Sequence, residues 1–129
     1  MKINLFKYLI LVYLFMVAPD IGGKTFQDSS IIGSWYSEKD TNWKIEFDSK
    51  GLCNWYYKDE LTGSYSYSIG NSSPWCGQEV PVENNTSYLM LNRESDGDQK
   101  CYEINGITDE TLSLRFLGRG GYMLFSRKK

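Results

Sequence analysis

The 129-residue sequence contains no histidine, and this absence excludes several kinds of active site at once. Neither a Ser-His-Asp triad nor a Cys-His pair can form without an imidazole, and no metal can be held through histidine. An excess of basic residues is also lacking, because 14 Lys and Arg residues stand against 16 Asp and Glu residues. A nucleic acid or an anionic membrane is therefore not expected as the main partner.

Long hydrophobic runs are absent as well. The longest run, Tyr8–Ala18, follows Lys2 and Lys7 and is shorter than the roughly 20 apolar residues of a membrane-spanning helix. A basic start followed by a short apolar run is typical of a secretory signal peptide, with a retained membrane anchor as the alternative. We assign residues 1–23 to the signal peptide and residues 24–129 to one domain, secreted or periplasmic.

Aromatic residues are abundant, with ten Tyr, six Phe and four Trp arranged in short alternating runs. Helical periodicity is missing after Gly23, whereas turn residues recur between the runs. Eight runs, and a weaker ninth at Gln78–Val82, predict an all-β antiparallel barrel or sandwich. The eight predicted strands are Ile31–Tyr36, Asn42–Asp48, Gly51–Lys58, Gly63–Ile69, Ser87–Asn92, Lys100–Asn105, Thr111–Leu117 and Tyr122–Arg127.

One register can be derived from the residues alone. The segment Phe47–Cys53 fits a hairpin with a three-residue loop in which Gly51 takes the left-handed position. Phe47 then faces Cys53, and alternation along both strands predicts an inward face. Its members are Trp43, Ile45, Phe47, Cys53, Trp55 and Tyr57, continued in the next strand by Tyr65, Tyr67 and Ile69.

Three cysteines allow three single disulfides in a secreted chain. Cys76 lies in a loop-like segment and Cys101 lies near the start of a predicted strand, whereas Cys53 belongs to the inward face. We therefore favour a bond between Cys76 and Cys101. Cys53 is then expected to be a buried thiol without reactivity.

A series of motifs follows in order along the chain: Gly33-Ser34-Trp35, Trp43–Phe47, the Gly51 turn, Gly63–Tyr67, Tyr102–Leu114 and Leu124–Arg127. This order resembles the small secreted lipocalin-like domains of Bacteroidetes-type bacteria. The resemblance covers residues 31–127. It implies a compact up-and-down β-barrel with one mouth.

In lipocalins the Gly-x-Trp tryptophan packs at the closed end of the barrel under an arginine from the last strand. The resemblance therefore implies a structural contact between Trp35 and Arg127, with Arg115 as the second candidate. The Thr-Asp-Tyr motif of larger lipocalins and the Arg-x-Tyr clamp of intracellular fatty-acid carriers are both missing. A fatty acid is therefore not specifically predicted.

No constellation of residues predicts catalysis. Without histidine the candidates are carboxylates, lysines, tyrosines and Cys53, and the acids lie mostly in turns or on outward positions. The alternating acids of Glu94–Asp98 lack the last Glu of an EF-hand loop, and we interpret them as a hairpin turn at Asp96-Gly97. We expect neither an enzyme nor a protein that holds a metal or another cofactor.

Two functions remain in competition. The first is a monomeric binding protein that holds a small apolar or aromatic ligand inside the barrel, unless bulky side chains fill the interior. The second is a protein-interaction or enzyme-inhibitor module with a filled barrel, in which Trp75 anchors a partner from a disulfide-tethered loop, unless Trp75 folds back to cap the barrel. The residues predicted to line the ligand cavity are Trp43, Phe47, Trp55, Tyr57, Tyr65 and Tyr67.

Overall fold

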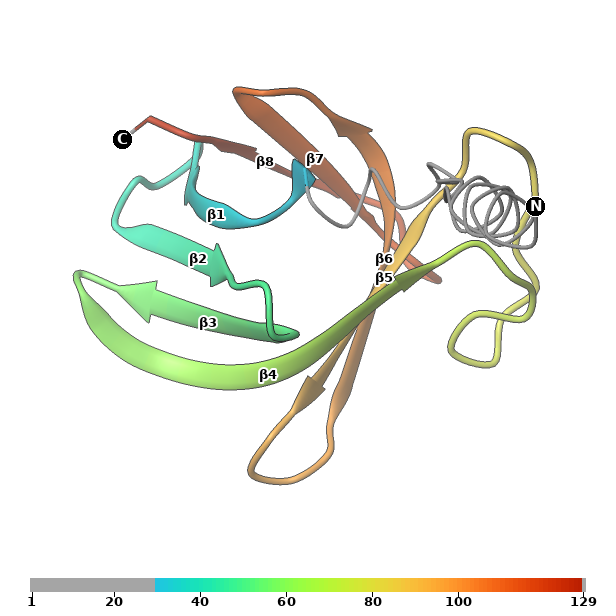
Figure 1. The fold of residues 1–129 in the computed structure, drawn as a ribbon, viewed down its shortest axis with the longest axis horizontal. Coiled ribbons are helices and arrows are strands. Elements are labelled where there is room, and N and C mark those ends of the chain that lie inside the picture. Colours follow the sequence, from blue (N-terminus) through green and yellow to red (C-terminus); the bar gives the residue numbers. More distant parts are fainter. Residues whose placement is uncertain (1–29, 129) are drawn as a thin grey trace, which may run out of the picture.

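The computed structural model describes residues 30–128, which form a closed barrel of eight antiparallel strands (Figure 1). Each strand pairs with its neighbours in chain order and β8 returns to β1, so the predicted all-β up-and-down barrel is confirmed. The predicted signal peptide, residues 1–23, lies outside the described residues. The strands are β1 (Gly33–Ser37), β2 (Trp43–Phe47), β3 (Leu52–Tyr57), β4 (Glu60–Gly70), β5 (Tyr88–Arg93), β6 (Gln99–Ile107), β7 (Thr111–Phe116) and β8 (Tyr122–Ser126).

The hairpin formed by β2 and β3 has the register derived from the sequence. Gly51 has the expected left-handed backbone, with a φ of 89°. Asp48 Oδ1 accepts hydrogen bonds from the amides of Lys50 and Leu52, at 2.8 and 2.9 Å, and so shapes the loop. Since opposed residues share a face, the inward side chains are those that the alternation predicted. The inward pairs are Trp43 with Tyr57, Ile45 with Trp55 and Phe47 with Cys53.

Strand β4 is longer than predicted and connects the two halves of the barrel. It has 11 residues, of which the first part, up to Ser66, pairs with β3 and the second part, from Tyr65, pairs with β5. A register shift between Trp55 and Tyr56 breaks the regular pairing of β3 with β4 and bends the ladder. Figure 1 shows β4 as a long curved strand that sweeps from β3 to β5.

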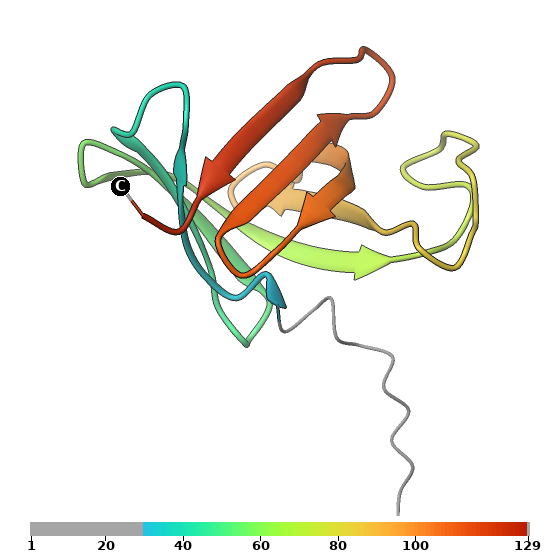
Figure 2. The ribbon, with the colours of Figure 1, turned by 90° about the horizontal axis from the view of Figure 1, so that it is seen from above.

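The ninth strand predicted at Gln78–Val82 does not form, and this prediction is wrong. The segment belongs to the loop between β4 and β5, where an isolated bridge joins Trp75 to Gln78. Pro81 has no N–H to donate to a ladder, and its carbonyl instead accepts a 2.7 Å hydrogen bond from the Tyr88 hydroxyl. Figure 2 shows this loop extending away from the strands at one side of the barrel.

Apolar and aromatic side chains from all eight strands pack in the interior. Because every strand contributes, the burial of apolar surface that stabilises the fold is spread around the whole barrel. The largest fully buried side chains include Trp35, Ile45, Leu89 and Leu112. The complete cluster consists of Ile31, Trp35, Ile45, Phe47, Cys53, Tyr65, Leu89, Leu91, Tyr102, Ile104, Leu112, Leu114 and Phe125.

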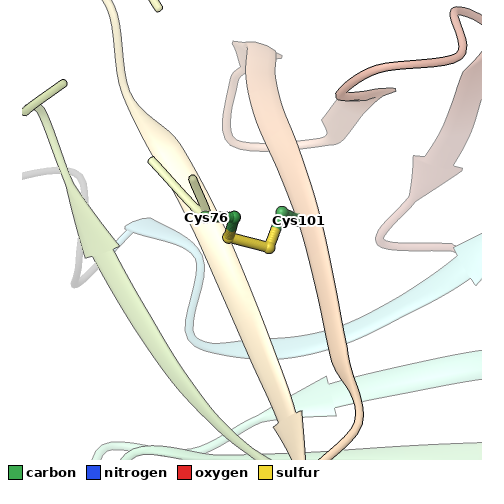
Figure 3. The surroundings of a disulfide bond; sticks show 2 residues. All are labelled: Cys76 and Cys101. Carbon is green, nitrogen blue, oxygen red and sulfur yellow. A yellow bond between two sulfur atoms is a disulfide. The ribbon is translucent and has the colours of Figure 1, made fainter. Parts of the chain in front are cut away.

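Cys76 and Cys101 are joined by a disulfide, as predicted (Figure 3). Cys101 lies in β6 next to the buried, inward Tyr102, so its own side chain is on the outer face of the barrel. The bond therefore ties the loop between β4 and β5 to the outside of the barrel wall. Cys53 is a free and buried thiol, which also agrees with the prediction.

One end of the barrel, here called the closed end, is formed by Trp35 and Arg127. The guanidinium carbon lies 3.7 Å from the centre of the Trp35 ring, which is the contact that the resemblance implied. Arg127 Nη1 and Nη2 donate 2.7 Å hydrogen bonds to the carbonyls of Ile32 and Ser30. Trp35 is fully buried, and its Nε1 donates to the carbonyl of Ile31 at 2.8 Å. The polar groups of both side chains are therefore hydrogen-bonded.

Gly33 shows why β1 begins later than the predicted Ile31. Its φ of 121° lies in a region that other residues rarely adopt. A Cβ at this position would also collide with the guanidinium of Arg127. The chain therefore bends at Gly33 to pass beneath the arginine, and regular pairing starts only from this residue.

Candidate functional site

The opposite end of the barrel, here called the mouth, contains two adjoining cavities. Their volumes are about 660 and about 390 Å³, which is the range of small-molecule pockets. Four residues line both cavities, so the two are parts of one hollow: Trp43, Trp55, Phe116 and Met123. The first cavity is completed by Ser37, Glu38, Lys39, Tyr122, Leu124 and Phe125, and the second by Thr62, Tyr65, Arg93, Lys100, Tyr102 and Arg119.

Aromatic rings from three consecutive strands form one wall of the mouth. Trp43 of β2 meets Trp55 of β3 edge to face, with ring centres 6.3 Å apart. Trp55 meets Tyr65 of β4 in the same manner, also at 6.3 Å. Tyr57 packs against Trp43 with ring centres 4.8 Å apart and supports it from the side. Because each ring is held by its neighbour, the wall is formed before any ligand arrives.

Three cations line the second cavity, and each comes from the end of a strand or from a hairpin loop. Arg93 is the last residue of β5, Lys100 is near the start of β6, and Arg119 lies in the loop between β7 and β8. Arg93 pairs with the inward Tyr65 and Lys100 pairs with the inward Leu91, so both lie on the inward face. This part of the mouth is therefore positive, although the chain carries a net charge of −2.

The three cations differ in the groups that already contact them. Arg93 forms an ion pair with Asp96, with 3.2 Å between Nη1 and Oδ2. The guanidinium carbon of Arg119 lies 4.1 Å from the centre of the Phe116 ring. Within residues 30–128, neither Lys100 nor Arg119 has an ion-pair partner. Two of the three positive charges of the second cavity are therefore not neutralised by the fold.

Cys53 is the thiol that the sequence raised as a candidate nucleophile, and it lies in β3 close to this site. It is fully buried, and burial raises the pKa of its thiol to about 12. The thiol is therefore protonated at neutral pH, whereas thiol chemistry needs the thiolate. Cys53 contributes packing to the barrel interior.

The six residues predicted to line the interior are divided between the mouth and the core. Phe47 and Tyr67 lie outside the lining of both cavities, with ring centres 5.0 Å apart and edge to face. The Tyr67 hydroxyl donates a 2.7 Å hydrogen bond to the carbonyl of Asp48, in the loop between β2 and β3. Tyr57 also lies outside both linings and packs behind Trp43. The other three line the hollow: Trp43, Trp55 and Tyr65.

Trp75 lies on the outside of the barrel wall. Its ring packs against Tyr88 of β5, with ring centres 6.1 Å apart, and covers Gly70 of β4 so closely that a Cβ there would come within 2.9 Å of it. The side chain is half-buried, and the neighbouring Cys76 is fixed to the wall by its disulfide. Trp75 therefore folds back onto the outer face, and not over the mouth.

Reasoning from the sequence missed the cations of the mouth. A signal was present for two of them, because the alternation that makes Leu91 and Tyr102 inward also turns Arg93 and Lys100 inward. A charged residue on an otherwise apolar face marks a functional candidate. Arg119 had no such signal, since its position depends on how the loop between β7 and β8 turns back over the barrel.

No protein-family model matches this chain, and no curated protein or solved structure matches it. In the part of the chain that the structure describes, residues 30–128, no group of three or more His, Cys, Asp or Glu is placed to hold a metal ion. The same residues include no helix with the length and apolar character that crossing a membrane requires.

Proposed function

We propose that this protein is a secreted, lipocalin-like carrier that binds one small apolar or aromatic molecule in the mouth of its barrel. The observation that carries the proposal is the joined pair of cavities, about 660 and about 390 Å³ in volume, that share four large apolar side chains. An eight-stranded barrel is wide enough to hold one small ligand when its own side chains leave room. The proposed ligand occupies the space that the core side chains leave open.

The surroundings of the cavity support an apolar ligand body. Trp43 and Trp55 present aromatic surface, and Phe116 and Met123 line the same hollow. A thioether adapts its shape to ligands of different outline, which suits a carrier. At the rim, Leu124 is 50% exposed and so offers further apolar surface for a ligand to cover.

The proposed location outside the cytoplasm rests on two independent features. The disulfide between Cys76 and Cys101 is of a kind that persists in oxidising compartments. The apolar run Tyr8–Ala18 has the length and basic flank of a secretory signal. A carrier in such a compartment meets molecules from outside the cell.

Binding of N-phenylnaphthylamine, an uncharged dye that becomes fluorescent in apolar surroundings, tests the proposal. We expect saturable binding of one dye per chain, with a dissociation constant of about 1–10 μM. The Trp43→Ala variant removes part of the aromatic wall and should weaken binding about tenfold. Trp75→Ala removes a ring from the outer wall and is the matched control, which should bind as the unchanged protein does.

Circular dichroism of each variant shows whether the barrel is intact. Absence of saturable binding to the folded protein would contradict the proposed function. Equal weakening by Trp43→Ala and Trp75→Ala would contradict the assignment of the site to the mouth. A native mass spectrum of the secreted protein then identifies the natural ligand, as a retained mass of a few hundred daltons that denaturation releases.

A further inference from the structure

We infer that the ligand carries one oxyanion, such as a carboxylate, sulfonate or phosphate monoester, which binds between Arg93, Lys100 and Arg119 while its apolar body lies against the aromatic wall. This inference rests on the proposed function, because it names the ligand class of the same cavity. It adds a charge requirement that neither the barrel fold nor the apolar lining implies.

The distribution of charge around the mouth is the first argument. The second cavity is lined by three cations and by no Asp or Glu. In the first cavity Glu38 and Lys39 are neighbours of opposite charge and add no net charge. Cations that are gathered around a partly apolar hollow repel one another, and an anion between them removes this repulsion. The chain has more acidic than basic residues, so the local excess is not a consequence of composition.

The position of Lys100 is the second argument. In β6 it pairs with Leu91 and stands on the same face as the buried Tyr102, so its stem lies on the inward side of the wall. The residue is half-buried and, among residues 30–128, has no carboxylate within ion-pair distance. The ammonium in this position therefore receives no counter-charge from the fold. A ligand oxyanion is the group that would supply it.

Arg93 is held in a fixed orientation beside Lys100. Its Nη1 donates to Asp96 Oδ2 at 3.2 Å, and its Nη2 donates to the Tyr65 hydroxyl at 3.4 Å. The guanidinium carbon lies 5.7 Å from the centre of the Tyr65 ring. A guanidinium has further N–H groups in the same plane, and a planar fork of donors matches the two oxygens of a carboxylate or phosphate. The fold thus orients Arg93 and leaves donors for a ligand.

Arg119 places the third charge where the apolar wall meets solvent. Gly118 and Gly120 on either side have φ of 89° and 73°, which lets the loop turn sharply. The guanidinium lies over Phe116, the ring that lines both cavities. A ligand whose body contacts Phe116 therefore has its polar end within reach of Arg119. The arrangement selects molecules with an apolar body and an anionic end.

Two dyes with the same ring system separate the charge requirement from apolar binding. Anilinonaphthalene sulfonate is N-phenylnaphthylamine with an added sulfonate, so only the first carries an oxyanion. We expect the folded protein to bind the sulfonate about tenfold more tightly than the uncharged dye. Raising the salt concentration should reduce this difference, because exposed charges are screened.

Lys100→Gln removes one charge from the cavity, and Lys50→Gln is the matched control in the exposed loop between β2 and β3. We expect Lys100→Gln to weaken binding of the sulfonate about 3- to 10-fold, which is a larger factor than for the uncharged dye. Lys50→Gln should change neither affinity. Arg119→Gln, at an exposed loop position, provides the same test if Lys100→Gln does not fold.

Each outcome decides at least one of the two proposals. Equal affinities for both dyes, or equal weakening by Lys100→Gln and Lys50→Gln, would overturn the oxyanion inference and leave the carrier function standing. Absence of binding of either dye to the folded protein would overturn both. If the inference holds, displacement of the sulfonate dye by naphthoate, compared with naphthyl phosphate, shows which oxyanion the three cations prefer.

Discussion

The two ends of the barrel contain the same pair of chemical groups in different surroundings. At the closed end Arg127 lies over Trp35, and at the mouth Arg119 lies over Phe116, at 3.7 and 4.1 Å from the ring centres. The side chain of Arg127 donates to backbone carbonyls that include Ile32. Within residues 30–128, that of Arg119 makes neither a hydrogen bond nor an ion pair.

The comparison indicates what separates a structural arginine from the ligand-binding arginine that we propose. Where backbone carbonyls occupy the N–H groups, the cation–π pair closes the barrel and stabilises the fold. Where the N–H groups stay accessible beside a cavity, the same pair offers donors to a ligand. The role of each arginine is therefore decided by the partners of its guanidinium, and not by its contact with the ring.

The largest loss of stability is expected from removing the disulfide, which fastens the loop between β4 and β5 to the wall. Replacing Cys76 and Cys101 together by Ser should lower the free energy of unfolding by about 3 kcal/mol, from the loop-closure entropy of a separation of 25 residues. Urea unfolding measures this change. Binding of N-phenylnaphthylamine in buffer should persist, and its loss in a folded variant would show that the outer wall shapes the mouth.

Arg127→Met is expected to have the second largest effect. The variant keeps the length of the side chain but loses the hydrogen bonds to the carbonyls of Ser30 and Ile32 and the charge over Trp35. Charged hydrogen bonds of this kind contribute about 2–3 kcal/mol in total once the loss of hydration is included. Urea unfolding should show a loss of this size, with dye binding unchanged. An unchanged midpoint of urea unfolding would contradict the structural role assigned to Arg127 at the closed end.

The Cys53→Ala variant tests whether Cys53 is shielded from the water that reaches the mouth. The test is the pH dependence of the free energy of unfolding. Burial raises the pKa of the thiol to about 12, whereas an unfolded chain has a thiol pKa of about 8.5. Stability from keeping the thiol protonated is complete below the unfolded pKa and is lost as the pH rises toward the folded one. At about pH 10 the loss should be about 1–2 kcal/mol.

The measurement for Cys53 is the free energy of unfolding between about pH 8 and about pH 10 for both proteins. The unchanged protein should lose stability more steeply than Cys53→Ala, which has no thiol to ionise. Tyrosines contribute equally to both proteins, so the difference between the two slopes isolates the thiol. Equal slopes would mean that water reaches Cys53 from the mouth.

Arg119→Met is expected to have the smallest effect on stability, and it is the direct counterpart of Arg127→Met. Only an exposed contact with Phe116 is lost, which contributes about 0.5 kcal/mol. The same urea experiment applies to both variants. Equal losses of unfolding free energy in Arg119→Met and Arg127→Met would contradict the different roles assigned to the closed end and the mouth.

Much of the fold could be predicted because it depends on local geometry. The left-handed Gly51 sets the loop of one hairpin, and the pairing of Phe47 with Cys53 follows from it. The disulfide between Cys76 and Cys101 could be predicted because Cys53 was already assigned to the inward face. In each case residues close in sequence, or simple elimination among few candidates, decided the outcome.

Position along the barrel axis could not be predicted in the same way. Alternation states which face a side chain occupies, but not how far it lies from the mouth. Phe47 and Trp43 share an inward face, and yet one packs in the core and the other lines the cavities. The register shift beside Trp55 adds to this, because it displaces β4 relative to β3. Depth is set by strand stagger around the whole barrel, which is a non-local property.

The closure between β1 and β8 has a further consequence. These strands pair through Tyr36 with Ser126 and Ser37 with Phe125, and Arg127 extends the connection to Ser30. A barrel that opens here becomes a sheet with two unpaired borders, and such borders recruit strands from other chains. Because Arg127 bonds to the carbonyls of Ser30 and Ile32, we expect it to hold this seam closed, and its loss to favour association between chains.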